Sequence, residues 1–410
     1  MRSAWLLPEH IADILPAQAQ RIEALRRRLL DQAQLFGYEL VIPPLLEHLD
    51  ALLSGTGREL DLSTFKLVDQ MSGRMLGLRA DTTPQAARID AHLLNRPGVT
   101  RLCYCGPVVH TRPTGLAATR EPLQFGAEMF GHQGLQADLE VAELALQCLR
   151  HAEAGPLVID LADARVLRGV LAGVPMDTEG LQNLAQALAS KDAPALAELC
   201  QGLPGEAPQA LQALLRLYGG DEVLAAARDV LPDRPLIRKA LEELAWLGSR
   251  LHAGDAALRV AFDLSDMSGY AYYSGPRFAL FAAGCNDTLA RGGRYDEVGA
   301  VFGRNRPAVG FSLDLKSLSE VAAVANGARP AAAVLAPWGE DPALLAEVRR
   351  LRALGDIVVR GLPAAPEDTD CTDDALVQAD AWRADRQLVL VDGHWAVQPL
   401  APAPMHIPTH

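Results

Sequence analysis

Apolar residues recur every three to four positions in several stretches of the chain, a spacing typical of amphipathic helices. Residues 21–36 keep this spacing up to Gly37, and residues 137–150 repeat it. Extended runs predict strands at 38–42, 65–69, 75–78, 101–109 and 123–129. The pair Ser72-Gly73 between two of these runs is typical of a hairpin. Strands and hairpins bracketed by helices predict an α+β fold built on an antiparallel sheet with flanking helices.

The pattern changes near residue 166, where Leu and Ala begin to recur at helical spacing between Gly- and Pro-containing breakers. This predicts an all-helical insertion. Strand-like sequence resumes at 257–263 and 277–283, so we expect the sheet to be completed after the insertion. A small α/β unit with a hairpin around Asp392-Gly393 is predicted near the end. The predicted divisions are a first core part (1–165), the insertion (166–255), a second core part (256–325) and the terminal α/β unit (330–400).

Composition narrows the class of protein. The 410 residues are 49% apolar, enough for a sizeable core, and the net charge of −13 provides no general attraction to a nucleic-acid backbone. The six cysteines are scattered, and the close pair Cys103 and Cys105 falls in a strand-like run, so we expect no metal site and a reduced setting. Neither a signal-peptide core nor a membrane-spanning run is found. We expect a cytoplasmic protein with no membrane partner.

Two motifs carry polar side chains that could bind a small ligand. In residues 78–84, Asp81 and Thr83 could hold an ammonium group, although an ordinary helix start, capped by Asp81 or Thr82, would use the same residues. In residues 123–131, Gln124 and Glu128 alternate and so share one face of a strand. That face could line an apolar cleft that binds a small polar ligand, or it could meet solvent.

Two further motifs combine aromatic residues with glycine. Residues 268–275 contain Tyr272 and Tyr273, whose flat rings suit an imidazole or another ring but could equally be core aromatics. In residues 291–296, the pair Gly292-Gly293 permits close backbone approach to a ligand, while a turn between strands would need the same residues.

Together and in this order, the motifs resemble histidyl-tRNA synthetase, a class II aminoacyl-tRNA synthetase, over about residues 5–320. Residues 38–47 are similar to the dimer-forming motif, residues 101–131 to the second class motif and residues 292–318 to the third with its approach. The resemblance implies a class II synthetase-like fold and self-association through the class II dimer interface. It also implies that histidine is bound by Asp81, Thr83, Gln124, Glu128, Tyr272 and Tyr273.

The chain departs from that family on the nucleotide side. The family's second motif has an arginine on the substrate phosphate and then a glutamate on adenine, but these places hold His110 and Arg112. Ser268 replaces the arginine that assists adenylation, and Ser317 replaces the arginine that braces ATP. Since losing one preorganised group commonly costs about 10²–10³ in rate, we expect no catalytic residues and no tRNA charging.

Retained amino-acid contacts with lost nucleotide contacts resemble the regulatory subunits of ATP phosphoribosyltransferase, synthetase-like paralogues without catalysis of their own. This implies a chain required for the first step of histidine biosynthesis, which confers feedback inhibition by histidine. It also implies a hetero-octamer with the short-form catalytic subunit, and no cofactor. Residues 330–410, where a synthetase has its anticodon domain, hold twelve acidic residues against six arginines, a net of −6. That balance argues against tRNA as a partner.

Two alternatives remain at this stage. An active histidyl-tRNA synthetase-like ligase would charge tRNA or modify another protein, and it would show histidine-dependent pyrophosphate exchange. An RNA-binding relic that senses nutrients would shift tRNA in a salt-sensitive manner, which the acidic composition disfavours.

Overall fold

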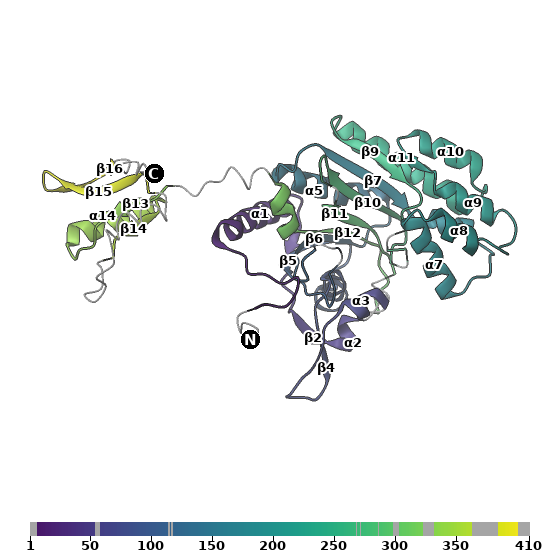
Figure 1. The fold of residues 1–410 in the computed structure, drawn as a ribbon, viewed down its shortest axis with the longest axis horizontal. Coiled ribbons are helices and arrows are strands. Elements are labelled where there is room, and N and C mark those ends of the chain that lie inside the picture. The colour runs from purple at the N-terminus through teal and green to yellow at the C-terminus, as the bar shows by residue number, and fades with distance from the viewer. Residues whose placement is uncertain are drawn as a thin grey trace, which may run out of the picture. The chain divides into compact units, whose positions relative to one another are not determined.

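The computed structural model describes residues 6–53, 58–113, 115, 118–267, 269–270, 272–285, 287–297, 303–322, 332–362 and 384–400. The chain divides into two compact units, Met1–Asn326 and Gly327–His410. Each unit is described by itself, with the element labels of Figure 1.

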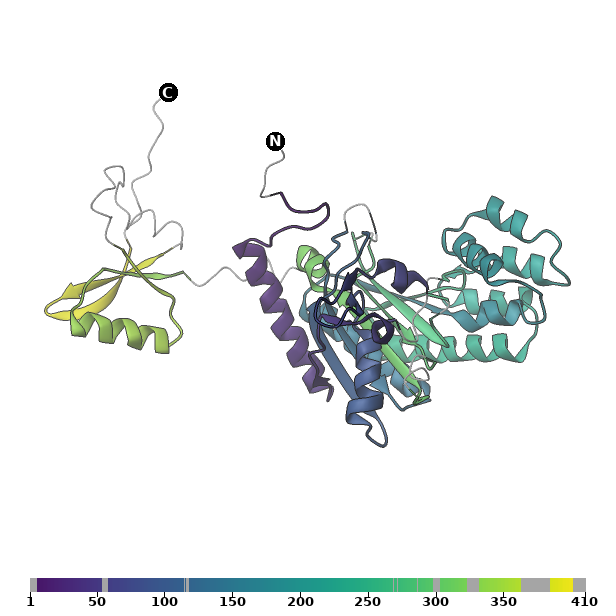
Figure 2. The same ribbon diagram turned by 90° about the horizontal axis from the view of Figure 1, so that it is seen from below.

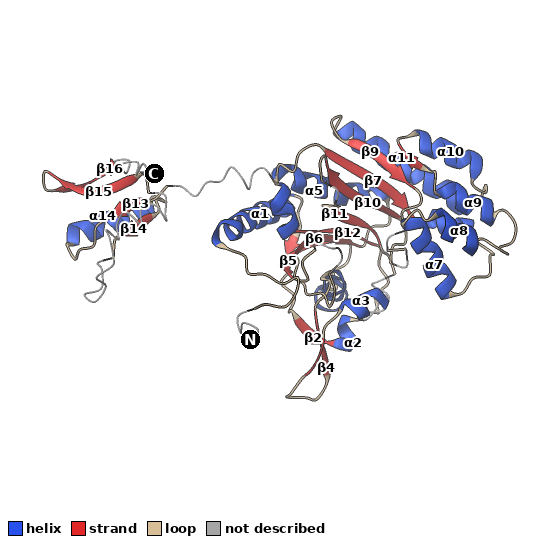
Figure 3. Cartoon of the chain, viewed as in Figure 1, coloured by secondary structure: helices blue, strands red, loops and turns tan. Residues whose placement is uncertain are grey.

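A nine-stranded sheet in the order β1-β5-β6-β12-β11-β10-β7-β9-β8 forms the centre of the first unit (Figure 3). Its strands are β1 (Glu39–Leu40), β5 (Thr100–Pro107), β6 (Leu123–Phe130), β7 (Leu157–Asp163), β8 (Tyr218–Gly219), β9 (Arg259–Asp263), β10 (Pro276–Ala282), β11 (Ala290–Arg294) and β12 (Ala308–Asp314). All pairs from β5 to β7 are antiparallel, as is β8 with β9. Two pairs, β1 with β5 and β7 with β9, are parallel. The predicted α+β fold is confirmed, with an antiparallel centre and a parallel pair towards each end.

Long amphipathic helices bury their apolar faces in one core with this sheet. They are α1 (Pro16–Leu35), α5 (Leu135–His151) and α11 (Pro235–Gly254). In α1 the buried positions Ile22, Leu25 and Leu29 follow the predicted spacing, although the helix begins at Pro16 rather than at residue 21. The short helix α12 (Leu315–Val321) lies beside α1, as both ribbon views show (Figures 1 and 2).

A second group of elements lies between β1 and β5 in sequence. A three-stranded sheet, ordered β2-β4-β3, joins β2 (Leu46–His48), β3 (Lys66–Val68) and β4 (Met75–Leu78). The antiparallel pairing of β3 with β4 confirms the predicted hairpin. Helices α2 (Leu49–Leu52) and α3 (Arg58–Ser63) lie between β2 and β3 in the sequence. Helix α4 (Thr83–Arg88), continued by the π-helix η1 (Ile89–Leu94), contacts β6 of the main sheet.

The segment predicted as an all-helical insertion is helical except at β8. Its helices are α6 (Ala164–Val170), α7 (Thr178–Ala189), α8 (Ala193–Leu199), α9 (Ala207–Leu214), α10 (Glu222–Val230) and α11. Tyr218 and Gly219 interrupt them because they pair with Asp263 and Phe262 of β9 and so extend the main sheet by one strand. Helices α7 to α10 gather at the end of this unit remote from α1 (Figures 1 and 2).

The second unit is a small α/β fold with a four-stranded sheet in the order β14-β13-β15-β16. Its elements are β13 (Val334–Ala336), α14 (Pro342–Ala353), β14 (Val358–Arg360), β15 (Arg386–Val391) and β16 (His394–Pro399). The predicted hairpin is present: Asp392 and Gly393, with φ angles of 49° and 78°, join β15 to β16. Positive φ at both positions is typical of a tight hairpin turn.

Candidate functional site

A cavity of about 80 Å³ opens over β6, β12 and β11 of the main sheet. A single water molecule needs roughly 10–15 Å³ of such space, so the cavity admits a ligand of several heavy atoms. Its lining consists of Asp81, Thr83, Glu128, Tyr272, Tyr273, Arg291, Tyr295, Gly310, Phe311 and Ser312. The structure thus brings five of the six predicted histidine-binding residues around one cavity, and the sixth, Gln124, donates a hydrogen bond to Asp81 of the lining.

Glu128 is the buried polar centre of this cavity. Its side chain is 1% exposed, so the alternative in which this strand face meets solvent is wrong for Glu128. Oε1 accepts hydrogen bonds from the hydroxyls of Tyr104 (2.9 Å) and Thr83 (2.9 Å), and Oε2 accepts one from Tyr295. Burial raises the pKa of Glu128 to about 8, although the hydroxyls that donate to it act in the opposite direction. The protonated form of Glu128 is therefore favoured near neutral pH, and a positive charge beside it would favour the ionised form.

Two glycines leave room for these buried side chains. A Cβ on Gly310 would overlap Oε2 of Glu128, and a Cβ on Gly126 would overlap the hydroxyl of Tyr104. Both glycines are in register with their neighbours, since Gly310 pairs with Glu128 and Gly126 with Tyr104. Glycine at these positions is required by close approach across the sheet rather than by an unusual backbone angle.

Asp81 is held at the cavity by Gln124 and by the start of α4. Nε2 of Gln124 donates to Oδ1 of Asp81 (2.8 Å), while Oε1 of Gln124 accepts from the backbone N–H of Thr82 (3.0 Å). The same Oδ1 accepts from the backbone N–H and the hydroxyl of Thr83, each at 3.2 Å. Asp81 accepts a hydrogen bond at the start of α4 and also lines the cavity, so its part in the helix start does not exclude ligand binding, which stays a prediction.

Aromatic rings form one wall of the cavity. Tyr272 lies edge-on to Tyr273, with ring centroids 5.2 Å apart and an interplanar angle of 83°. Tyr272 also stacks on Tyr295, with centroids 5.1 Å apart and an angle of 25°. Such a wall combines flat apolar faces with hydroxyl groups, which suits a small heterocycle.

The residues that depart from the synthetase pattern differ in their surroundings. The ring Nε2 of His110 is 2.9 Å from the carbonyl oxygen of Ala80, within hydrogen-bond reach. Arg112 is exposed. Ser317 donates from Oγ to Asp314 (2.8 Å), which caps the start of α12. Ser268 lies outside the described residues. In the described part of the structure, none of these residues lines the cavity.

Several residues that line the cavity or bind Glu128 were not predicted from the sequence. Tyr104 and Tyr295 donate to Glu128, and Arg291 and Ser312 contribute polar groups to the lining. The signal for Tyr104 was available, because Tyr104 alternates with its neighbours within the predicted strand at 101–109. Gly292 and Gly293 lie within β11, so the alternative in which they form a turn is wrong, while close backbone approach to a ligand stays a prediction. Both glycines approach the adjacent strands closely.

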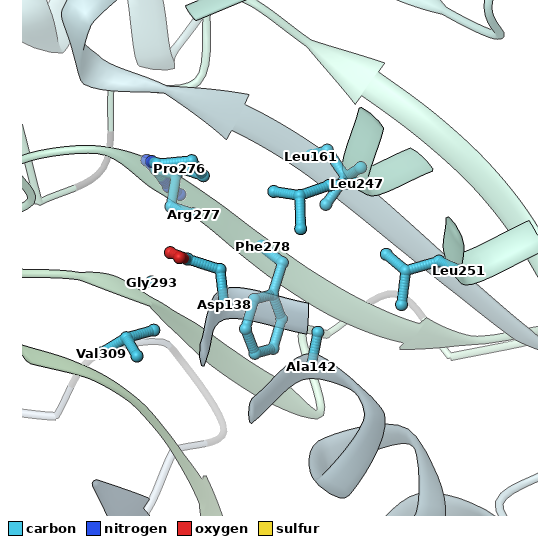
Figure 4. A pocket seen from close by; sticks show the side chains of 10 residues that line it. All are labelled: Asp138, Ala142, Leu161, Leu247, Leu251, Pro276, Arg277, Phe278, Gly293 and Val309. Atoms are coloured by element: carbon cyan, nitrogen blue, oxygen red, sulfur yellow. The ribbon is translucent and has the colours of Figure 1, made fainter. Parts of the chain in front are cut away.

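A second cavity, shown in Figure 4, lies between β10, α5 and α11. Leu161, Leu247 and Leu251 contribute apolar side chains to it, and the carboxylate of Asp138 is bound by Nε of Arg294 (3.1 Å). At about 10 Å³ it holds at most about one water molecule, so it is not a ligand site. The described residues also contain no group of three or more His, Cys, Asp or Glu side chains placed to hold a metal ion.

Comparison with known proteins places the main unit in the class II aminoacyl-tRNA synthetase-like fold. The histidyl-tRNA synthetase family matches residues 10–318. A histidyl-tRNA synthetase from Nostoc sp. PCC 7120 has the same fold, with a TM-score of 0.74 at 18% identity over 97% of each chain. An ATP phosphoribosyltransferase regulatory subunit/histidyl-tRNA synthetase from Bacillus halodurans gives a TM-score of 0.80 at 25% identity, over 94% of this chain and 98% of the other.

Full-length relatives define the family more narrowly. Regulatory subunits of ATP phosphoribosyltransferase from Acidovorax ebreus and Albidiferax ferrireducens are 55% and 56% identical to the chain. These alignments cover 97% and 96% of this chain and 99% of each relative. Residues 331–398 match the ATP phosphoribosyltransferase subunit HisZ C-terminal domain. The chain therefore belongs to the ATP phosphoribosyltransferase regulatory subunit family and is a regulatory component in histidine biosynthesis, not a catalytic one. No helix in the described ranges is long and apolar enough to span a membrane.

Proposed function

We propose that the chain senses free histidine in the cavity over β6, β11 and β12 and transmits its occupancy to the short-form catalytic subunit of ATP phosphoribosyltransferase. The observation that carries this proposal is the difference between the two sides of the synthetase-like site. Acidic and aromatic side chains suited to an amino acid converge on one cavity, whereas the positions for the nucleotide hold His110, Arg112 and Ser317. A histidine pocket without adenylation machinery becomes a sensor.

Asp81 and Glu128 take the α-ammonium group of histidine in this proposal. Both line the cavity, and the hydroxyl of Thr83 lies within hydrogen-bond distance of both (3.2 and 2.9 Å), so the three side chains form one polar cluster. A cation placed there favours the ionised form of Glu128, which burial otherwise opposes. Gln124 acts by positioning Asp81.

Tyr272 and Tyr273 flank the imidazole ring. Their edge-on arrangement provides a ring face and a ring edge within the same cavity. An aromatic wall of this kind favours a flat heterocycle over an aliphatic side chain of similar size.

The chain does not activate the amino acid. The arginines that act on ATP in the synthetase family are replaced at positions 110, 268 and 317. Ser317 belongs to the start of α12 through its bond to Asp314. Histidine-dependent exchange of pyrophosphate into ATP tests this statement directly. We expect exchange at background level, and a rate clearly above background would show that the chain is a ligase.

Regulation follows from ordinary linkage in this proposal. If histidine binds more tightly to the inhibited assembly than to the active one, histidine shifts the equilibrium towards inhibition. A coupling of about 1–3 kcal/mol, roughly 5–150-fold in affinity, is typical of such systems. The partner is the short-form catalytic subunit, with which the chain forms a hetero-octamer in the cytoplasm, and tRNA is not a partner.

Self-association occurs through the edge of the main sheet. The strand β1 forms the first edge of this sheet and pairs only with β5 among the described strands. Leu40 is 48% exposed and Ile42, just beyond the strand, is 81% exposed. An unpaired edge with exposed apolar side chains supports an interface at this place.

Isothermal titration with L-histidine tests the sensor proposal. The isolated chain is titrated first, and the complex with the catalytic subunit second, because the subunit interface could contribute to the site. We expect saturable binding with one histidine per regulatory chain. Absence of binding to the assembled complex would refute the proposal.

A further inference from the structure

The cavity contains one basic side chain among its described lining residues, and this side chain has no assigned role. Arg291 lies on β11, whereas the other charged lining residues are the carboxyl groups of Asp81 and Glu128. A free amino acid carries a carboxylate as well as an ammonium group. The acidic side of the cavity suits the ammonium group, so the carboxylate needs a cation elsewhere in the lining.

The register of the sheet places Arg291 on the cavity face. Arg291 pairs with Ser312 of β12, and Ser312 pairs with Gly126 of β6. Paired residues share one face of a sheet, and Glu128 is two residues from Gly126 on that face. Arg291 therefore stands two strands away from Glu128, about 10 Å across the sheet at the usual strand spacing. Both side chains line the same cavity.

The guanidinium group of Arg291 is available for an anion. Its one hydrogen bond in the described structure joins Nη2 to the hydroxyl of Thr288 (3.0 Å), and it forms no ion pair with a described residue. Two arginines nearby differ in this respect. Arg277 is buried and paired with Asp266, and Arg294 is buried and paired with Asp138.

The positive charge of Arg291 affects the pKa of Tyr273, one of the aromatic residues of the cavity. Burial raises the pKa of Tyr273, and the positive charges of Arg277 and Arg291 act against this rise. Arg291 and Tyr273 also line the same cavity.

We propose that Arg291 binds the α-carboxylate of the histidine held in the cavity, with the hydroxyl of Ser312 beside it. This inference rests on the proposed function and adds the chemical class of ligand that the sensor accepts. The site then requires an ammonium group at Asp81 and Glu128 and a carboxylate at Arg291. Imidazole amines without a carboxylate bind more weakly, so the sensor favours the free amino acid over its reduced and decarboxylated forms.

In this arrangement Arg291 provides a positive charge for the carboxylate of histidine, although Ser268 replaces the arginine of the synthetase family. The synthetase-like motif has an arginine at that place, and the chain has serine. Arg291 on β11 provides a positive charge from another part of the sequence. Because Arg291 is exposed and is not part of the core, its replacement should leave the fold intact.

Competitive titration of the full-length chain tests the inference with three ligands: L-histidine, its amino alcohol and histamine. We expect the wild-type protein to bind histidine roughly 10–100-fold more tightly than the other two, as a charge-assisted contact implies. In Arg291→Gln this preference should shrink to within about threefold because histidine binding weakens while binding of the amines is unchanged. Arg291→Lys should retain part of the preference.

Arg259→Gln is the matched control, since Arg259 is an exposed arginine on β9 of the same sheet and does not line the cavity. It should leave all three affinities unchanged. If the wild-type protein binds histidine and Arg291→Gln keeps the full preference, the role of Arg291 is refuted and the sensor proposal stands. If the wild-type protein and its complex bind no histidine at all, the sensor proposal itself is refuted.

Discussion

Gly310 on β12 pairs directly with Glu128 on β6, and the missing side chain of Gly310 provides the space that the carboxylate of Glu128 occupies. A Cβ at this position would overlap Oε2 of Glu128. The polar centre of the cavity therefore depends on a cross-strand pair and not on Glu128 alone.

Gly310→Ala should displace Glu128 and disable the cavity. Overpacking of this kind typically costs about 1–3 kcal/mol of stability, and we expect histidine affinity to fall at least tenfold as the hydroxyl contacts of Glu128 are broken. Urea denaturation and titration calorimetry measure the two effects. Gly254→Ala is the control, because a Cβ on Gly254 meets no atom within 4 Å. Unchanged histidine binding in Gly310→Ala would contradict the proposal that histidine binds in this cavity.

Histidine binding should release a proton near neutral pH. Glu128 has a pKa of about 8 in the empty protein and is mostly protonated at pH 7, whereas an ammonium group beside it favours the ionised form. Calorimetry at pH 7 in buffers of different ionisation enthalpy should reveal release of close to one proton per site. Glu128→Gln cannot ionise and should release none through this group. Binding heats that do not depend on the buffer would contradict this assignment.

The same group affects stability in the absence of ligand. The pKa of Glu128 is raised from 4.5 to about 8, so the folded state favours the protonated form. Its contribution is therefore fully present below about pH 4.5 and is lost as the pH rises through about 8. The difference in unfolding free energy between wild-type protein and Glu128→Gln should accordingly shift in favour of Gln between these pH values. Parallel denaturation curves at pH 6 and pH 8.5 measure this shift.

Tyr295→Phe should lower the stability of the protein and its affinity for histidine without changing the shape of the cavity. The mutation removes the hydroxyl that donates to Oε2 of Glu128, and loss of a buried partner commonly costs about 1–3 kcal/mol. We expect that loss in thermal or urea unfolding, together with weaker histidine binding. Tyr218→Phe removes a hydroxyl from a side chain that is 58% exposed and should change stability by less than about 0.5 kcal/mol. Equal effects of the two mutations would argue against the hydrogen-bond cluster.

The sequence predicted which polar side chains share a strand face. It did not predict which residues contact each other across strands. Alternation along β6 placed Gln124 and Glu128 on one face, because side-chain direction in a strand is a local property. It did not distinguish a buried face from a solvated one. That distinction depends on Tyr104 and Tyr295, which reach Glu128 from sequence separations of 24 and 167 residues. Such contacts follow from sheet register, which the local pattern does not determine.

The same limit applies to the fold. Helix spacing identified α1 and α5, since their buried stripes repeat within each helix. The strand β7 was not anticipated, although it is fully integrated between β10 and β9. The parallel pairing of β7 with β9 spans the whole helical segment between them, so no short-range signal marks it. The brief strand β8 was missed for the same reason.

Ile42→Glu should reduce self-association. Ile42 is 81% exposed next to the edge strand β1, and a charge placed in an apolar interface carries a desolvation cost. Light scattering coupled to size exclusion should show a shift towards monomer with unchanged helix content. Val230→Glu alters a 52% exposed side chain on α10, remote in sequence from the edge, and should leave the molar mass unchanged. An unchanged mass for Ile42→Glu would place the interface elsewhere.

The most direct measurement of the central claim is a histidine inhibition curve of the phosphoribosyltransferase reaction. The short-form catalytic subunit is co-expressed with the wild-type chain, with Gly310→Ala or with Gly254→Ala, and the purified complexes are compared. We predict that histidine inhibits the wild-type and Gly254→Ala complexes similarly, and that at least tenfold more histidine is needed with Gly310→Ala while uninhibited activity is retained. Identical inhibition curves for all three complexes would contradict the claim that histidine is sensed in this cavity.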